Sequence, residues 1–364
     1  MKNRKKDAAE TDPRLGKVGG QAVMEGVMMK AGDRTCTAVR QEDGSVTVVT
    51  RNFSSIRKKH KWLNIPVLRG AINFVEMMIL SYKTLSISAD AFVGETEEES
   101  KFEKWIKDKF GAKLLDFFMV IATVLGLALG LAIFIYLPDL LVGGLKALTR
   151  AEFRYTSALL AGLFRILIFL LYIFLVSRMS YIRRTFEFHG AEHKSIACFE
   201  AGEELTPENA KKYTRFHPRC GTSFIFVLML LSILIFTLVF LIPGTNAPLV
   251  RLLLRLLLLP LVVGIGYEYI MYAGKHCNRV TKICSAPGLW MQRLTTREPD
   301  LEQLNVAILA LKSALPEIFP AEEVEAEIAR TRKTPAAPPE EGAAPESPAP
   351  DAADGAAAGN APEA

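Results

Sequence analysis

Long apolar runs in the middle of the chain predict helices that cross a membrane. Residues 117–137 and 224–242 contain no charged side chain, and residues 157–176 and 250–272 contain only a few. A helix of about 20 apolar residues spans the hydrocarbon core of a bilayer. We therefore predict four transmembrane helices. The alternative, buried helices of a large soluble domain, fits the two charge-free runs least well.

The N-terminal part of the chain shows a strand pattern instead. Residues 35–50 alternate apolar and polar side chains on both sides of an Asp-Gly pair, which is a favoured hairpin turn. The preceding segment, residues 19–32, is dense in Gly and Met. We interpret it as an irregular strand pair, because glycine permits tight turns and close backbone approach.

Three further segments predict helices outside the apolar runs. Apolar residues recur every three or four positions in 66–92 and in 299–315, which is the spacing of an amphipathic helix. We expect the helix over 66–92 to lie on the membrane surface or to pack on the bundle. Residues 96–113 predict a charged helix that leads into the first span.

The average composition conceals this division of the chain. Its 364 residues are 50 % hydrophobic and 23 % charged, which excludes a wholly disordered chain, a collagen-like repeat and a small disulfide-rich domain. The predicted fold class is mainly α: a four-helix polytopic membrane bundle with a small N-terminal β-hairpin element, amphipathic cytoplasmic helices and a disordered C-terminal tail. The predicted parts are a basic disordered tail (1–16), a cytoplasmic N-terminal module (17–114), a four-span membrane domain (115–297) with a His-rich cytoplasmic loop (177–223), cytoplasmic helices (298–332) and a disordered acidic tail (333–364).

The distribution of basic residues predicts the orientation. Near the spans, one side of the predicted topology holds 16 lysines and arginines and the other holds three. Because basic residues stay on the cytoplasmic side, we expect both termini in the cytoplasm. The net charge of +5 then has two explanations: attraction of the basic residues to anionic lipid, or an N-terminal basic tail that is simply solvated. We do not expect nucleic-acid binding, because the sequence lacks the pattern of interleaved aromatic and basic residues that is typical of it.

The candidate chemistry lies in the loop at 177–223. Residues 189–193 read HGAEH, which places His189 and His193 on one face of a helix. Two imidazoles at this spacing are typical ligands of a divalent metal such as Zn²⁺, and Glu192 is the candidate general base for metal-bound water. The alternative is a polar helix whose histidines bond to neighbouring backbone.

A catalytic zinc needs a third protein ligand. Glu200 follows His193 by two helical turns, and His217 and Cys220 lie on a turn just before the third span. We predict that one of these three completes the site. His217 could instead orient another ligand, and Cys220 could be a buried thiol, since disulfides are improbable in the reducing cytoplasm.

Several other polar residues stay open at this point. His276 is adjacent to Cys277 after the fourth span, and we favour a structural role for it over metal ligation. Charged side chains within spans are costly and often functional. The predicted spans hold four charged residues: Arg165, Arg251, Arg255 and Glu268. We interpret Arg251 as structural, and the roles of the other three are undecided.

Four sequence blocks resemble the YqhQ-like bacterial membrane family of unknown function. The blocks are GGQAVMEGVMMK, HGAEHKSIACFE, HPRCGTSF and LTTREPD, and they run in the family's order between about residues 17 and 312. The resemblance implies a bacterial inner-membrane protein, labelled a predicted metal-dependent enzyme on its histidine pattern. The matching positions that look site-like are Glu25, His189, Glu192, His193, His217 and Cys220; Glu25 is a candidate only through the resemblance.

These features favour a membrane-bound metal-dependent hydrolase with its site at the cytoplasmic face. A second hypothesis is a non-catalytic scaffold or assembly factor that docks a cytoplasmic protein, such as translocation machinery, and carries a closed structural metal site. A third is a transporter, supported by the charged residues Arg165, Arg255 and Glu268. The lipid bilayer is the expected partner in all three.

Overall fold

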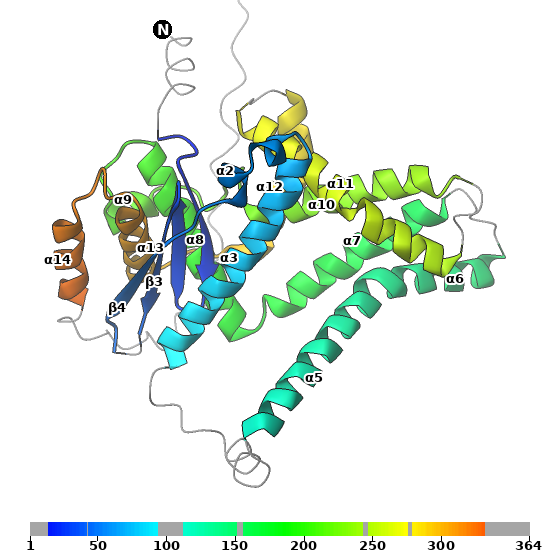
Figure 1. Cartoon of the computed structure of the whole chain (residues 1–364), viewed down its shortest axis with the longest axis horizontal. Helices are drawn as coiled ribbons and strands as arrows, with labels where there is room; N and C mark the ends of the chain where they lie inside the picture. Colours follow the sequence, from blue (N-terminus) through cyan, green and yellow to red (C-terminus); the bar gives the residue numbers. More distant parts are fainter. Residues whose placement is uncertain are drawn as a thin grey trace, which may run out of the picture.

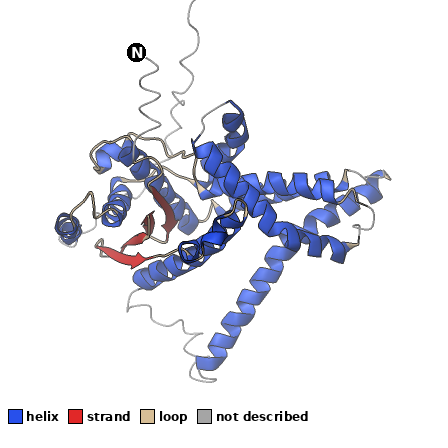
Figure 2. Ribbon diagram, turned by 45° about the horizontal axis from the view of Figure 1, so that its top comes forward, coloured by secondary structure: helices blue, strands red, loops and turns tan. Residues whose placement is uncertain are grey.

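The computed structural model describes residues 14–41, 43–93, 112–150, 156–242, 247–275 and 279–331. Some sequence predictions fall wholly or mostly on residues outside these ranges. They are the two terminal tails, the charged helix at 96–113 and the role of His276. Within the described ranges the fold is mainly helical, with one small sheet. Figure 2 shows the sheet embedded among helices on one side, with longer helices extending away from it.

The N-terminal module is a four-stranded antiparallel sheet in the order β1-β2-β3-β4. The hairpin predicted at 35–50 is formed by β3 (Arg34–Arg40) and β4 (Val46–Asn52). The segment predicted as an irregular strand pair is regular instead, because β1 (Val18–Val23) and β2 (Gly26–Ala31) pair in unbroken register. The sheet therefore has twice the strands that the hairpin alone provides.

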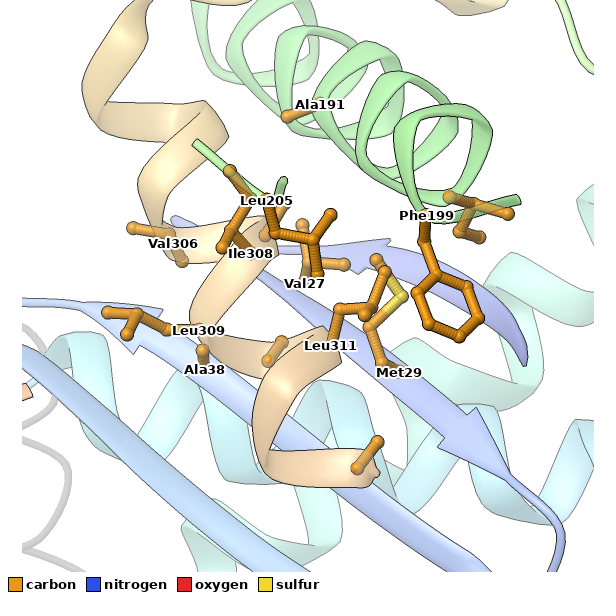
Figure 3. Close-up of a cluster of buried hydrophobic side chains, with 14 of the residues drawn as sticks. Val27, Met29, Ala38, Ala191, Phe199, Leu205, Val306, Ile308, Leu309 and Leu311 are labelled. Atoms are coloured by element: carbon orange, nitrogen blue, oxygen red, sulfur yellow. The ribbon is translucent and has the colours of Figure 1, made fainter. Parts of the chain in front are cut away.

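One face of this sheet carries the main hydrophobic core. It packs against α8 (Ser180–Glu200) and α13 (Leu301–Ala314), which come from distant parts of the chain. Figure 3 shows Phe199 of α8 and Leu311 of α13 meeting Met29 of β2. Two smaller helices border this core, α9 (Pro207–Lys211) and α14 (Ala321–Thr331). Two short helices, α2 (Ile56–Lys59) and η1 (Lys61–Asn64), follow β4 in the chain.

Within the described residues, four helical segments are long and apolar enough to cross a membrane. The second, third and fourth contain α7 (Ser157–Val176), α10 (Gly221–Val239) and α11 (Pro248–Lys275), close to the predicted bounds. Figure 1 shows them extending away from the sheet. This arrangement confirms the predicted four-span membrane architecture.

The first span differs from its prediction. The sequence indicated an end at residue 137, but α5 (Ala112–Leu131) continues through a π-helical turn, η3 (Ala132–Tyr136), into α6 (Leu137–Thr149). Pro138 lies in the first turn of α6, and because the helix is continuous there, its missing N–H leaves the carbonyl group of Phe134, four residues earlier, without its usual helical donor. Residues 138–149, which follow the predicted end of the first span, are therefore helical as well.

The charged side chains of the spans have protein partners. The Nε–H of Arg165 donates to the carbonyl oxygen of Phe134, inside the π-helical turn, at 2.9 Å. Arg255 bonds to both carboxylate oxygens of Asp139 across the bundle, at 3.0 and 3.3 Å. Because apolar surroundings penalise an unpaired charge, these contacts assign the two arginines a clear structural role in joining helices.

Two further helices connect the membrane segments with the sheet. The first, α3 (Leu68–Val93), packs on α11 and on the sheet, and α12 (Arg279–Thr295) packs on α10. Helix α12 runs through Pro287 and Gly288, although this pair of residues is typical of turns. Packing on α10 holds α12 in place. At this contact, Nε2 of Gln292 donates to the hydroxyl of Ser223 at 2.8 Å.

We predict that Gly190→Ala lowers the melting temperature of the detergent-solubilised protein. A Cβ at Gly190 would lie 2.0 Å from the carbonyl oxygen of Arg297, so α8 would have to move away from the segment that follows α12. Forcing an extra methyl into such a contact costs about 1–3 kcal/mol. The matched control is Gly143→Ala in α6, where a Cβ has nothing within 4 Å. Equal melting temperatures for the two variants would contradict this packing.

Candidate metal centre

The candidate site is built on α8, at the level where this helix is most buried. His189, Glu192 and His193 are spaced i, i+3 and i+4, so their side chains leave one face of the helix. The two imidazole rings lie with centroids 4.4 Å apart. The structure therefore confirms that the HGAEH motif is helical and that its two histidines lie on one face of the helix.

Cys220 supplies a third donor atom from another part of the chain. It is the N-cap residue of α10 and follows a short turn that begins at His217. Its Sγ lies 3.2 Å from Nε2 of His189. One donor atom from each of His189, His193 and Cys220 lies within 4.8 Å of the other two.

Backbone carbonyl groups fix both imidazole rings. Nδ1 of His189 lies 2.8 Å from the carbonyl oxygen of Thr295, and Nδ1 of His193 lies 2.5 Å from that of Arg215. A carbonyl oxygen only accepts, so each Nδ1 must carry the proton and donate it. In a neutral ring, Nε2 then presents its lone pair. Metal-binding histidines are oriented by this kind of bond.

The electrostatics of the three donors favour a thiolate. Burial raises the pKa of the Cys220 thiol, but His189 and His193 outweigh it and hold that pKa well below its ordinary value. The N-terminus of α10 acts in the same direction. Burial lowers the pKa of His189, but Cys220 and Glu192 outweigh it and raise that pKa to about 9. Without a metal, these shifts favour the thiolate of Cys220 together with the protonated imidazole of His189.

Glu192 is buried between α8 and the first strand of the sheet. A Cβ at Gly20 would lie 2.8 Å from Oε1 of Glu192, so a side chain at this position would displace the carboxyl group. Burial raises the pKa of Glu192, and the neighbouring histidines oppose this shift. Sequence reasoning did not connect Gly20 with the site, because the strand and the helix are far apart in the chain.

His217 and Glu200 lie beside the three donors and belong to a second cluster. The rings of His193 and His217 are 5.4 Å apart, and Nε2 of His217 lies 3.9 Å from a carboxylate oxygen of Glu200. Glu200 pairs with Arg219 and accepts the backbone N–H of Gly16 at 2.8 Å. Of the three candidates for third ligand, Cys220 is therefore the one that the fold brings to His189 and His193.

Two hydrogen bonds with the side chain of Gln292 hold the backbone of His217 in place. The backbone N–H of His217 donates to Oε1 of Gln292, and Nε2 of Gln292 donates to the carbonyl oxygen of His217, both at 2.8 Å. Gln292 is fully buried in α12. Sequence reasoning overlooked it, since a single glutamine in an amphipathic helix carries no signal for a distant histidine.

Glu25 lies apart from the three donors. It occupies the turn between β1 and β2 with a positive φ of 49° and forms an ion pair with Arg184 of α8. The structure thus gives Glu25 a role in attaching the sheet to α8. His276 is outside the described residues.

The comparisons with known proteins decide the family. A model described as "Protein of unknown function (DUF1385)" matches residues 65–317. The chain belongs to the DUF1385 family. It is similar to the "Uncharacterized protein YqhQ" of Bacillus subtilis (strain 168), with 35 % identity over 304 residues, which cover 82 % of this chain and 92 % of the relative. No solved structure matches.

The DUF1385 match contains most of the candidate site. His189, Glu192, His193 and Cys220 fall within the matched residues, whereas Gly20 precedes them. The predicted resemblance to the YqhQ-like family is confirmed. A family described as of unknown function transfers no reaction to this chain, so the chemistry must be argued from the site.

We predict that Glu200→Gln destabilises the protein at neutral pH and that this effect shrinks in acid. Burial raises the pKa of Glu200, but bonds from His217, Arg219 and Gly16 outweigh it and lower that pKa to about 2. A carboxyl group with a depressed pKa stabilises the fold above its unfolded pKa of about 4.5 and loses this contribution as the pH falls toward 2.

Melting temperatures in detergent between pH 7 and pH 3 provide the measurement. The gap between wild type and Glu200→Gln should be constant at neutral pH and should narrow below about pH 5. Glu325→Gln, at an exposed position of α14, is the control and should show a small gap at every pH. A gap for Glu200→Gln that widens in acid would contradict the assignment.

Proposed function

We propose that this protein is a membrane-bound, metal-dependent hydrolase with one Zn²⁺ held by His189, His193 and Cys220. The observation that carries the proposal is the orientation of the two imidazoles. Each ring donates Nδ1–H to a backbone carbonyl group and has Nε2 available near the Cys220 sulfur. Nitrogen and thiolate donors are the ligands that zinc prefers, and three protein ligands leave a fourth position for water.

Glu192 is the proposed general base. A bound zinc would polarise a water molecule and lower its pKa toward neutrality. Glu192 immediately precedes His193 in α8, and burial raises the pKa of its carboxyl group. A carboxylate with a pKa nearer neutrality accepts the proton of an attacking water and returns it to the leaving group more effectively.

The position of the site limits the substrate. Cys220 directly precedes the span at Gly221–Val239, so the three donors lie at the edge of the apolar region. A peptide near the membrane, a lipid headgroup or another amphiphile would reach this level. We further propose a bacterial plasma membrane location with both termini in the cytoplasm, which follows from the excess of basic residues on that side.

A scaffold with a closed structural site is the second candidate. The observation that favours it is burial, since only 2 % of His193 and 6 % of Cys220 are exposed. Structural zinc sites have no position for substrate, whereas catalytic ones keep a position open. In this function the metal stabilises the contact between α8 and α10, and a cytoplasmic protein would dock elsewhere on the surface.

The metal hypothesis is tested by elemental analysis of protein purified in detergent without added chelator. We expect about one zinc per chain, and loss of most of it in His193→Ala and in Cys220→Ser. His217→Ala is the matched control, since His217 lies outside the three-donor group, and it should keep the metal. Wild-type protein without stoichiometric zinc, iron or manganese would overturn the proposal.

Glu192→Gln separates the two candidate functions. The amide keeps the size of the side chain but cannot act as a base, so the variant should retain its zinc and lose activity. Complementation of a deletion strain, together with the lipid and peptide profiles of its membranes, gives the readout. Failure to complement with full metal content supports the hydrolase, while full complementation supports the scaffold.

A further inference from the structure

Helix α3 presents an apolar stripe that no described part of the protein covers. The opposite face of the helix is buried at Leu80 and Thr84, and the Ser81 hydroxyl donates to the Gln21 side chain of β1 at 2.5 Å. The exposed stripe follows the three- and four-residue spacing of one helix face, and its members are Val75, Met78, Ile79, Tyr82 and Leu85.

The segment before α3 also has exposed apolar side chains. Ile56, Trp62 and Ile65 are exposed there, and 68 % of Trp62 and 77 % of Tyr82 are accessible. Trp and Tyr are the residues that concentrate at membrane–water interfaces, because they combine an apolar ring with a polar group. Large exposed apolar surfaces of this kind mark contact sites.

The same region carries exposed positive charge. Lys59 and Lys61 are exposed on either side of His60, next to Trp62. The neighbouring cations Arg57 and Lys58 already bind acidic side chains, Glu76 and Asp33. Basic side chains beside exposed aromatic and aliphatic residues are typical of segments that bind an anionic lipid surface.

The contact of α3 with α11 fixes where this surface lies. Nε of Arg69, in the first turn of α3, donates to Oε1 of Glu268 at 2.6 Å, and Glu268 belongs to the span Leu249–Ala273. The start of α3 is therefore held near the end of a membrane-crossing segment. Figure 1 shows α3 continuing from there between the sheet and the long helices.

We propose that the stripe of α3 and the exposed residues of 56–65 form a docking surface for the bilayer, with Lys59 and Lys61 on anionic headgroups. The aliphatic and aromatic side chains of the stripe would enter the boundary between headgroups and acyl chains. Docking in this way would hold the sheet, and with it the face of α8 that carries His189, close to the membrane.

The test places a fluorophore at Tyr82→Cys in the full-length protein, in nanodiscs with nitroxide groups on the lipid acyl chains. The unsubstituted protein, labelled in parallel, gives the background of Cys284, which is exposed. Leu171→Cys, on the exposed side of α7, is the positive control. Glu325→Cys, at an exposed position of α14 on the other side of the sheet, is the negative control.

We expect lipid nitroxides to quench the label at position 82 nearly as strongly as at 171, and several-fold more than at 325. Quenching at 82 should increase when phosphatidylglycerol is added to phosphatidylcholine, and Lys59→Glu with Lys61→Glu should remove that increase. Quenching at 82 as weak as at 325, with strong quenching at 171, would overturn the proposal and leave a protein partner as the occupant of the stripe. An increase with phosphatidylglycerol that persists in the double variant would overturn the role of the two lysines.

Discussion

The imidazole of His189 is bonded at both nitrogens, and the organisation of the site depends on these two contacts. One nitrogen donates to the carbonyl oxygen of Thr295, at the end of α12, and the other lies next to the sulfur of Cys220, at the start of α10. A single ring thus connects three helices that are distant in sequence. Because an unpaired buried polar group costs free energy, loss of either contact would disturb all three helices together.

The core under α8 explains why this ring is held so firmly. The sheet, α8 and α13 share one apolar cluster, in which Val27, Phe188 and Leu309 are fully buried. Protein interiors of this kind are close-packed and resist displacement. The face of α8 that bears the histidines is therefore part of a rigid element, which is what a metal centre needs, since its ligands must converge within a narrow range of distances.

The membrane segments are held together by polar contacts and by close side-chain packing rather than by the exclusion of water. Lipid tails are as apolar as the side chains they contact, so the exclusion of water gives little preference for one helix partner over another. Asp139 with Arg255, and the Phe134 carbonyl group with Arg165, provide specific contacts between α6 and α11 and between η3 and α7. Arg165 and Arg255, two of the residues that suggested a transport pathway in the sequence, therefore also join helices of the bundle.

The sequence alone determined those features that depend on local periodicity. Apolar runs of about 20 residues predict spans whatever the rest of the chain does, and the HGAEH spacing places His189, Glu192 and His193 on one helical face. The Thr206-Pro207-Glu208 signal likewise predicts the start of α9, where Thr206 caps the helix. These features need no knowledge of distant contacts.

Only the tertiary structure decided the features that join distant segments. Glu200, His217 and Cys220 were equal candidates for the third donor, and the choice of Cys220 follows from the turn that places the start of α10 beside α8. The space that Gly20 leaves for Glu192, and the strand pair that completes the sheet, arise in the same way. The physical reason is that spacing along a chain specifies which side chains share a face, whereas packing between elements specifies which faces meet.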